Sequence, residues 1–125
     1  MKKKPYFNRK RKPVNANLAA NYCVNLDTYM RSQGISGNQL ATQSGISQKT
    51  IWVVQAGKTR PTVMTAEAIA TALGLDARVM MGGVLTAEQL SRSARIGRMF
   101  DKLMTLGSEE LQAVGILIDS MTSKD

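Results

Sequence analysis

The stretch LATQSGISQKTIWVV, residues 40–54, constrains the fold more than any other part of the chain. Two short segments with inward-facing apolar residues are separated by Gly45, which can take a left-handed turn conformation without a Cβ penalty. Ala41 is small enough to let two backbones approach closely, and Ile46 follows the turn as an apolar plug. Ser47 can accept from the free amide groups of a second helix. The pattern predicts two short helices that cross at a steep angle.

The second of these helices has a face that its core contacts do not use. Ile51 and Val54 are three residues apart and point inward on a helical projection. Lys49 and Val53 fall almost opposite that inner face, and Gln48 and Trp52 occupy one shoulder. These four side chains are therefore expected on the exposed side.

The rest of the chain favours further helices. Apolar residues at helical spacing, with polar caps and terminal glycines, predict helices starting near Leu18 or Tyr22 and ending at Gly34, and over residues 37–44, 48–56, 62–73 and 77–81. No segment keeps a period-2 alternation, so the predicted fold is all-α.

Residues 84–125 predict a two-helix hairpin after the pair Gly82-Gly83. Thr86 and Gln89 have the spacing of a capping box, and Gly107 interrupts the apolar stripe that follows. This stripe is wider than a lone hairpin could bury, so we expect it to be a homodimer seam rather than only an internal core. The expected dimer residues are Leu103, Leu111, Val114, Leu117 and Ile118.

Six positions within residues 40–54 define a known motif: Leu40, Ala41, Gly45, Ile46, Ile51 and Val54. Residues 22–81 as a whole resemble the xenobiotic-response-element (XRE) or Cro/phage-repressor family of helix-turn-helix domains. The second half of that resemblance is carried by Gly57, Pro61, Ile69, Ala70, Leu73 and Gly74. The resemblance implies a five-helix repressor-like domain over residues 18–83, double-stranded DNA as partner, and a prokaryotic or phage origin.

The resemblance also implies roles for single residues. It makes the helix that begins at Gln48 the recognition helix of the major groove, with Gln48, Lys49, Val53 and Trp52 reading bases. It places six residues beside the DNA backbone: Asn38, Ser47, Thr50, Lys58, Thr59 and Arg60. The chain departs from the family where Gln and Arg are frequent, because it has Gly37 and Met30 there, and Asn38 is the replacement we expect for the first.

Some of these side chains also have purely structural interpretations. Trp52 could pack over the fourth helix or the N-terminal arm instead of contacting DNA. Val53 could be unspecific exposed apolar surface, and Lys49 a solubilising lysine. These alternatives stay open at the level of the sequence.

Positive charge is concentrated at the N-terminus. Residues 1–12 contain seven of the 17 Lys and Arg and no acid, whereas residues 13–83 sum to +2 and residues 84–125 to −1, which together give the net charge of +8. We expect residues 1–17 to be a flexible arm that contacts phosphates, although a solvated charge run is the alternative. Its cations are Lys2, Lys3, Lys4, Arg9, Lys10, Arg11 and Lys12.

Composition argues against other classes of protein. The chain has one cysteine and no histidine, so neither an internal disulfide nor a metal cluster is expected. No run of apolar residues is long enough to span a membrane. We therefore expect no enzyme activity, no cofactor and no metal, and a cytoplasmic, nucleoid-associated protein.

The resulting functional hypothesis is a sequence-specific transcriptional regulator, a repressor that binds a palindromic operator as a homodimer. One such domain covers little DNA, so paired half-sites about 34 Å apart are expected. The alternative is an antitoxin-type protein, which binds a partner protein through its C-terminal hairpin and autoregulates its operon.

Overall fold

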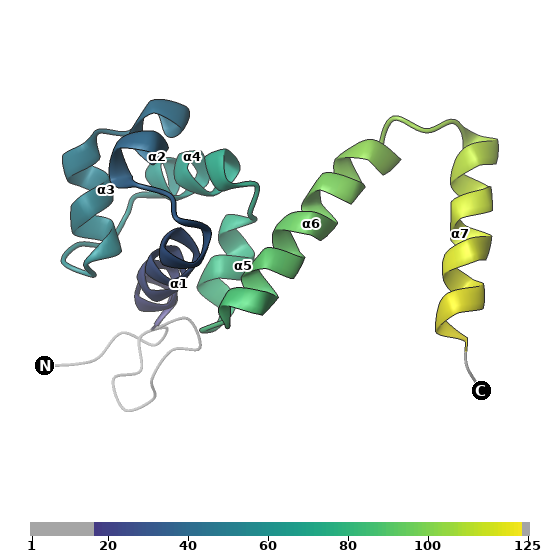
Figure 1. Cartoon of the computed structure of the whole chain (residues 1–125), viewed down its shortest axis with the longest axis horizontal. Coiled ribbons are helices and arrows are strands. Elements are labelled where there is room, and N and C mark those ends of the chain that lie inside the picture. Colours follow the sequence, from purple (N-terminus) through teal and green to yellow (C-terminus); the bar gives the residue numbers. More distant parts are fainter. Residues whose placement is uncertain (1–16, 124–125) are drawn as a thin grey trace, which may run out of the picture.

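A computed structural model describes residues 17–123, and within that range every regular element is a helix (Figure 1). The all-α prediction is confirmed. The elements are α1 (Leu18–Gln33), α2 (Gly37–Ser44), α3 (Gln48–Gln55), α4 (Val63–Leu73), α5 (Ala77–Gly82), α6 (Ala87–Leu103) and α7 (Ser108–Thr122). The seven cations predicted in the arm lie outside the described residues.

Polar side chains fix where several helices begin. Ser36 Oγ accepts from the Gln39 amide at 3.1 Å, and Gln39 Oε1 accepts from the Ser36 amide at 2.8 Å, which closes a capping box at α2. The box predicted between Thr86 and Gln89 forms at α6, with distances of 3.0 and 2.9 Å. These bonds satisfy amide groups that have no partner inside the helix.

One hydrophobic core joins α1 to the four-helix set formed by α2, α3, α4 and α5. Tyr22 and Leu26 of α1 are fully buried in it, together with Ile51 of α3 and Met80 of α5. The Tyr22 hydroxyl donates to the carbonyl oxygen of Ala66 at 2.7 Å, which ties α1 to α4. The core therefore holds α3 in a fixed position while leaving its outer face uncovered.

Asn25 is the buried polar side chain of this core, and all of its hydrogen-bonding groups have partners. Its Nδ2 donates to the carbonyl oxygens of Met80 and Gly83, both at 2.7 Å, and its Oδ1 accepts from the Leu85 amide at 2.8 Å. A buried amide is stable only when it is satisfied in this way. Asn25 therefore fastens the α5–α6 connection to α1.

The hydrophobic core continues past residue 83, the boundary predicted from the sequence, into α6. Leu90 is 0% exposed and Ala94 is 1% exposed, and both belong to the same cluster as Tyr22. A Cβ at Gly97 would lie 3.4 Å from the Gly74 carbonyl oxygen, so α6 passes close over the end of α4. The first half of α6 therefore belongs to the preceding domain.

The two helices predicted after Gly83 are present but do not pack closely on each other. Two helices do follow Gly83, but α7 has no buried residue, and α6 and α7 are not among the closely packed helix pairs of the described chain. Figure 1 shows α6 leading away from the other helices and α7 turning back from its far end. Apolar periodicity predicted each helix correctly but does not determine whether the two helices pack on each other.

Candidate nucleic-acid interface

The turn between α2 and α3 is built as its residues predict. Gly45 has a φ of 77°, and its amide donates to the Ala41 carbonyl oxygen at 2.9 Å. The Ile46 amide donates to Ser44 Oγ at 3.1 Å, and the Ile46 side chain packs against the core. A residue with a Cβ would be strained at this φ, so Gly45 sets the angle between the two helices.

Ser47 caps α3 and also engages Thr50, one turn into the helix. Ser47 Oγ accepts from the Thr50 amide at 3.1 Å and donates to Thr50 Oγ1 at 2.8 Å. Because the Thr50 hydroxyl accepts in this pair, its own hydrogen remains a donor. The N-terminal turn of α3 thus presents a hydroxyl donor beside two exposed residues, Gln48 and Lys49.

The outer face of α3 follows the prediction for three of its four side chains. Gln48, Lys49 and Trp52 are exposed, whereas Val53 is half-buried. Val53 is less exposed than a position opposite the core should be, because the segment after α3 folds back beside it: the Lys58 amide donates to the Val53 carbonyl oxygen at 2.9 Å.

The residues predicted to contact the DNA backbone gather on the same side of the domain. Gln48 Cγ would lie 3.8 Å from a Cβ at Gly37, so the start of α3 adjoins the start of α2, where Asn38 is exposed. A shallow depression further along α3 is lined in part by Thr50, Val53, Lys58, Thr59 and Arg60.

Trp52 lies beside α1 rather than over α4. Its side chain is 56% exposed and shares a shallow pocket with Asp27 and Arg31 of α1. Lys58 Nζ stands 4.9 Å from the centroid of the indole ring, within the range of a cation–π contact. The aromatic face is thus occupied by a cation from the loop that follows α3, and packing over α4 is not what fixes this ring.

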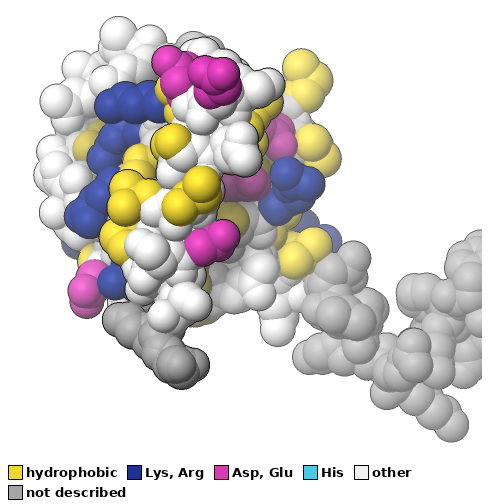
Figure 2. Space-filling view, turned by 90° about the vertical axis from the view of Figure 1, so that its right-hand side faces the viewer, with side chains coloured by type: hydrophobic (Ala, Val, Ile, Leu, Met, Phe, Trp, Pro, Cys, Tyr) yellow, Lys and Arg dark blue, Asp and Glu magenta, His cyan; other side chains and the backbone are white. Residues whose placement is uncertain are grey.

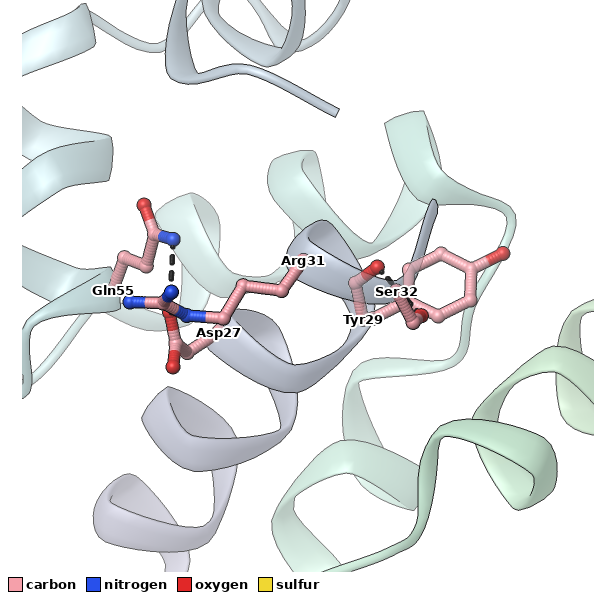
Figure 3. Close-up of polar contacts among 5 residues, drawn as sticks. All are labelled: Asp27, Tyr29, Arg31, Ser32 and Gln55. Atoms are coloured by element: carbon pink, nitrogen blue, oxygen red, sulfur yellow. Dashed lines mark hydrogen bonds and ion pairs between the residues drawn. The ribbon is translucent and has the colours of Figure 1, made fainter. Parts of the chain in front are cut away.

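A polar contact between α1 and α3 was not predicted from the sequence. Figure 3 shows Arg31 and Gln55 pointing toward Asp27: Asp27 Oδ1 accepts from Arg31 Nε at 2.8 Å and from Gln55 Nε2 at 3.0 Å. At the end of α1, Ser32 Oγ donates to the Tyr29 carbonyl oxygen at 3.0 Å. The spacing of Asp27 and Arg31, four residues apart, was a detectable signal, whereas nothing local points to Gln55.

The electrostatic character of this surface is positive. The sequence has no Asp or Glu between Asp27 and Glu67, and it has Arg31, Lys49, Lys58 and Arg60 there. Among the described residues the ion pairs are Asp27–Arg31 and Asp76–Arg78, so the three later cations are not neutralised by an acid. A surface of this kind attracts a polyanion.

The predicted dimer residues occupy the other end of the molecule. Leu103 and Val114 are half-buried, and the other three are exposed: Leu111, Leu117 and Ile118. No group of three or more potential metal ligands occurs within residues 17–123, and no helix of this range is long and apolar enough to cross a membrane.

Comparison with known proteins agrees with the geometry of α2 and α3. Residues 26–79 match a protein-family model described as helix-turn-helix, which confirms the predicted resemblance over that segment. No curated protein and no solved structure gives a significant match to the chain. The matched segment begins within α1 and ends within α5.

Proposed function

Because residues 26–79 are a helix-turn-helix domain, which indicates a DNA-binding transcription regulator, we propose that the protein is a repressor that occupies a palindromic operator as a homodimer. The observation that carries this proposal is the outer face of α3, where exposed Gln48 and Lys49 project from a helix that Ile51 and Val54 anchor in the core. This face has no acid near it in sequence, and its polar groups match those that read base edges.

The residues of the interface have two kinds of role. Lys49 donates to guanine O6 and N7, Gln48 pairs with adenine, and Val53 and Trp52 contact thymine methyl groups. The remaining residues hold the protein on the phosphates: Asn38, Ser47, Thr50, Lys58, Thr59 and Arg60. The depression along α3 supports a single interface for both groups, because Val53 lies there beside Lys58 and Arg60.

The proposed organisation has three parts, of which residues 1–17 are a basic arm and residues 18–83 the DNA-binding domain. Residues 84–125 supply the dimer contacts, although α6 begins inside the core of the domain. The exposed apolar side chains of α6 and α7 support a role in association. Such a regulator acts in the cytoplasm, on the nucleoid.

Genomic footprinting with the purified chain tests the function directly. A repressor should protect paired half-sites with dyad symmetry near a promoter, and a reporter placed behind that promoter should be silenced. Protection without symmetry, or activation of the reporter, would contradict the proposal.

The arm has its own test. Deleting residues 2–12 should weaken binding to operator and random DNA alike, because seven cations release counterions without reading bases. Each lost phosphate contact should reduce the magnitude of the negative slope of log affinity against log salt by roughly 0.9. An unchanged slope would remove the arm from the interface.

An antitoxin-type role is the second candidate, and the open face of α7 is the observation that favours it. A partner protein bound there should co-purify with the chain in a fixed ratio and should be lost when α7 is deleted. A homodimer that purifies without a bound partner protein would support the repressor function instead.

A further inference from the structure

The last two helices carry an apolar surface that nothing in the described chain covers. On α7, Leu111 is 48% exposed and Ile118 is 44% exposed, although their spacing with Val114 and Met121 makes one continuous stripe. Figure 2, which views the molecule from its α7 side, shows hydrophobic side chains on this face flanked by basic and acidic ones. A helix with such a stripe is stable in water only when the stripe is packed against something.

A receiving surface for such a stripe exists on α6. A groove of about 630 Å³ runs between α6 and the end of α4 with α5. Its apolar lining is Leu75, Val79, Ile96, Gly97 and Phe100, and it is also lined by charged residues of both signs: Arg78 and Arg98, and Glu67, Asp76 and Asp101. Ile96 and Phe100 are both more than half exposed, so the groove presents apolar side chains without a cover.

The charges of the two helices are complementary. Helix α6 has Arg92, Arg95, Arg98 and Lys102 against Glu88 and Asp101, a net charge of +2, and α7 has Glu109, Glu110 and Asp119 and no base, a net charge of −3. Among the residues that the structure describes, no ion pair joins α6 to α7. Within one chain, therefore, the apolar side chains of α6 and α7 do not pack on each other and their opposite charges do not pair.

We propose that two copies of the chain exchange α7, so that the apolar stripe of each α7 packs into the α6 groove of the other copy. The proposal rests on the proposed homodimer and specifies its geometry: the contact is α6 with α7 across the dimer, made twice. The alternative, a seam in which α7 packs on α7, would bring two helices of net charge −3 together.

Exchange also lowers the area that each contact must bury to form a stable interface. A specific dimer buries at least about 1,200 Å² in total, which is large for one contact of a helix of 15 residues. Exchange makes the same contact twice, so each contact has to bury only about half of that total. Leu111, Ile118 and Met121 of the stripe are exposed, so the stripe is accessible for this contact.

Crosslinking between differently tagged chains separates exchange from a symmetric seam. Two single-cysteine variants are prepared in a Cys23→Ala background, Ser93→Cys in the α6 groove and Leu117→Cys on α7, and then mixed and oxidised. Exchange predicts that the mixed 93–117 product exceeds the 117–117 product several-fold. A dominant 117–117 product would overturn exchange while leaving the homodimer intact.

Charge reversal gives a second, independent measurement by analytical ultracentrifugation. Arg98→Glu, in the groove, should weaken self-association, and so should Glu109→Lys with Asp119→Lys, whereas an equimolar mixture of the two variants should form the heterodimer. Glu88→Lys, at the opposite end of α6, is the matched control and should remain a dimer. A mixture no more associated than its parents would overturn the proposal.

These outcomes are separate from those that test the proposed function. If the wild-type chain protects a symmetric operator but the cysteine variants crosslink only through 117–117, the exchange of α7 is wrong and the proposed repressor function is retained. If the 93–117 product forms but no operator is protected, exchange is supported and the proposed DNA-binding function is wrong.

Discussion

Gln55 of α3 donates from Nε2 to Asp27 Oδ1 of α1 across 3.0 Å, and the same oxygen accepts from Arg31 at 2.8 Å. This link joins the helix proposed to read DNA to the first helix of the core. The Asp27 side chain is 33% exposed, so solvent weakens the ionic part of the contact. Its larger consequence is geometric, because it limits how α3 can move against α1.

Replacing Asp27 tests this link. Asp27→Ala should lower the free energy of unfolding by about 1 kcal/mol, because Gln55 and Arg31 both lose their acceptor. Asp27→Asn is the matched control, since it retains an oxygen for Gln55 and should lose less. Urea unfolding of both variants measures the difference, and equal stability in the two would show that the hydrogen bond to Gln55 is unimportant.

The structure assigns Leu90 to the core of the DNA-binding domain, and this has a direct consequence for stability. Leu90→Ala should destabilise the chain by about 2–5 kcal/mol, as expected for a fully buried leucine. Ile116→Ala on α7 is the control, because that side chain is 64% exposed, and it should change stability by less than about 0.5 kcal/mol. Similar effects of the two substitutions in urea unfolding would contradict the core assignment.

The turns and caps could be predicted from the sequence because they depend on neighbouring residues. Gly45, Ser47 and the pair Thr86–Gln89 each act over four residues or fewer, so their types and spacing determine the local structure. The packing of α6 on the core could not be predicted in the same way. Glycine pairs mark a flexible joint, but whether the next helix packs on the core depends on distant partners such as Tyr22.

Contacts between distant elements were the part that sequence patterns could not predict. Asp27 and Gln55 are 28 residues apart, and a polar pair across two helices has no periodic signature. The relation of α6 to α7 is similar, because the apolar stripe on α7 indicates that a partner exists without indicating which surface it is. The exposed face of α3 was predictable because its anchors, Ile51 and Val54, fix the rotation of one short helix.

Ionisation of Tyr22 should lower the free energy of unfolding at alkaline pH. Burial raises the pKa of its phenol above the ordinary value, and the negative charges of Cys23 and Glu67 add to the effect. The folded state therefore favours the neutral phenol, so this contribution to stability is complete below about pH 10, the ordinary tyrosine pKa, and falls as the pH rises further. Thermal melts should show a steeper alkaline loss for wild type than for Tyr22→Phe; identical slopes would refute this role.

Replacing Trp52 distinguishes a packing role of the indole from a contact with DNA. Because the ring is 56% exposed, Trp52→Ala should lower the free energy of unfolding by less than about 1 kcal/mol while weakening operator binding. Trp52→Phe keeps an aromatic face for Lys58 and should retain more of the affinity. A large drop in melting temperature with unchanged base preference would mean that the ring is a packing residue.

Competition binding over a randomised half-site tests the central claim, which is that α3 reads sequence through Gln48, Lys49 and Val53. Alanine at Gln48 or Lys49 should weaken operator binding by roughly 1–3 kcal/mol and relax the preference at particular base pairs, with little loss on random DNA. Val53→Ala should relax the preference for thymine. Lys58→Ala is the control and should weaken operator and random DNA about equally, because phosphate contacts do not discriminate between bases. An unaltered base preference in the Gln48, Lys49 and Val53 variants would contradict the account, since α3 would then not be the element that reads the operator.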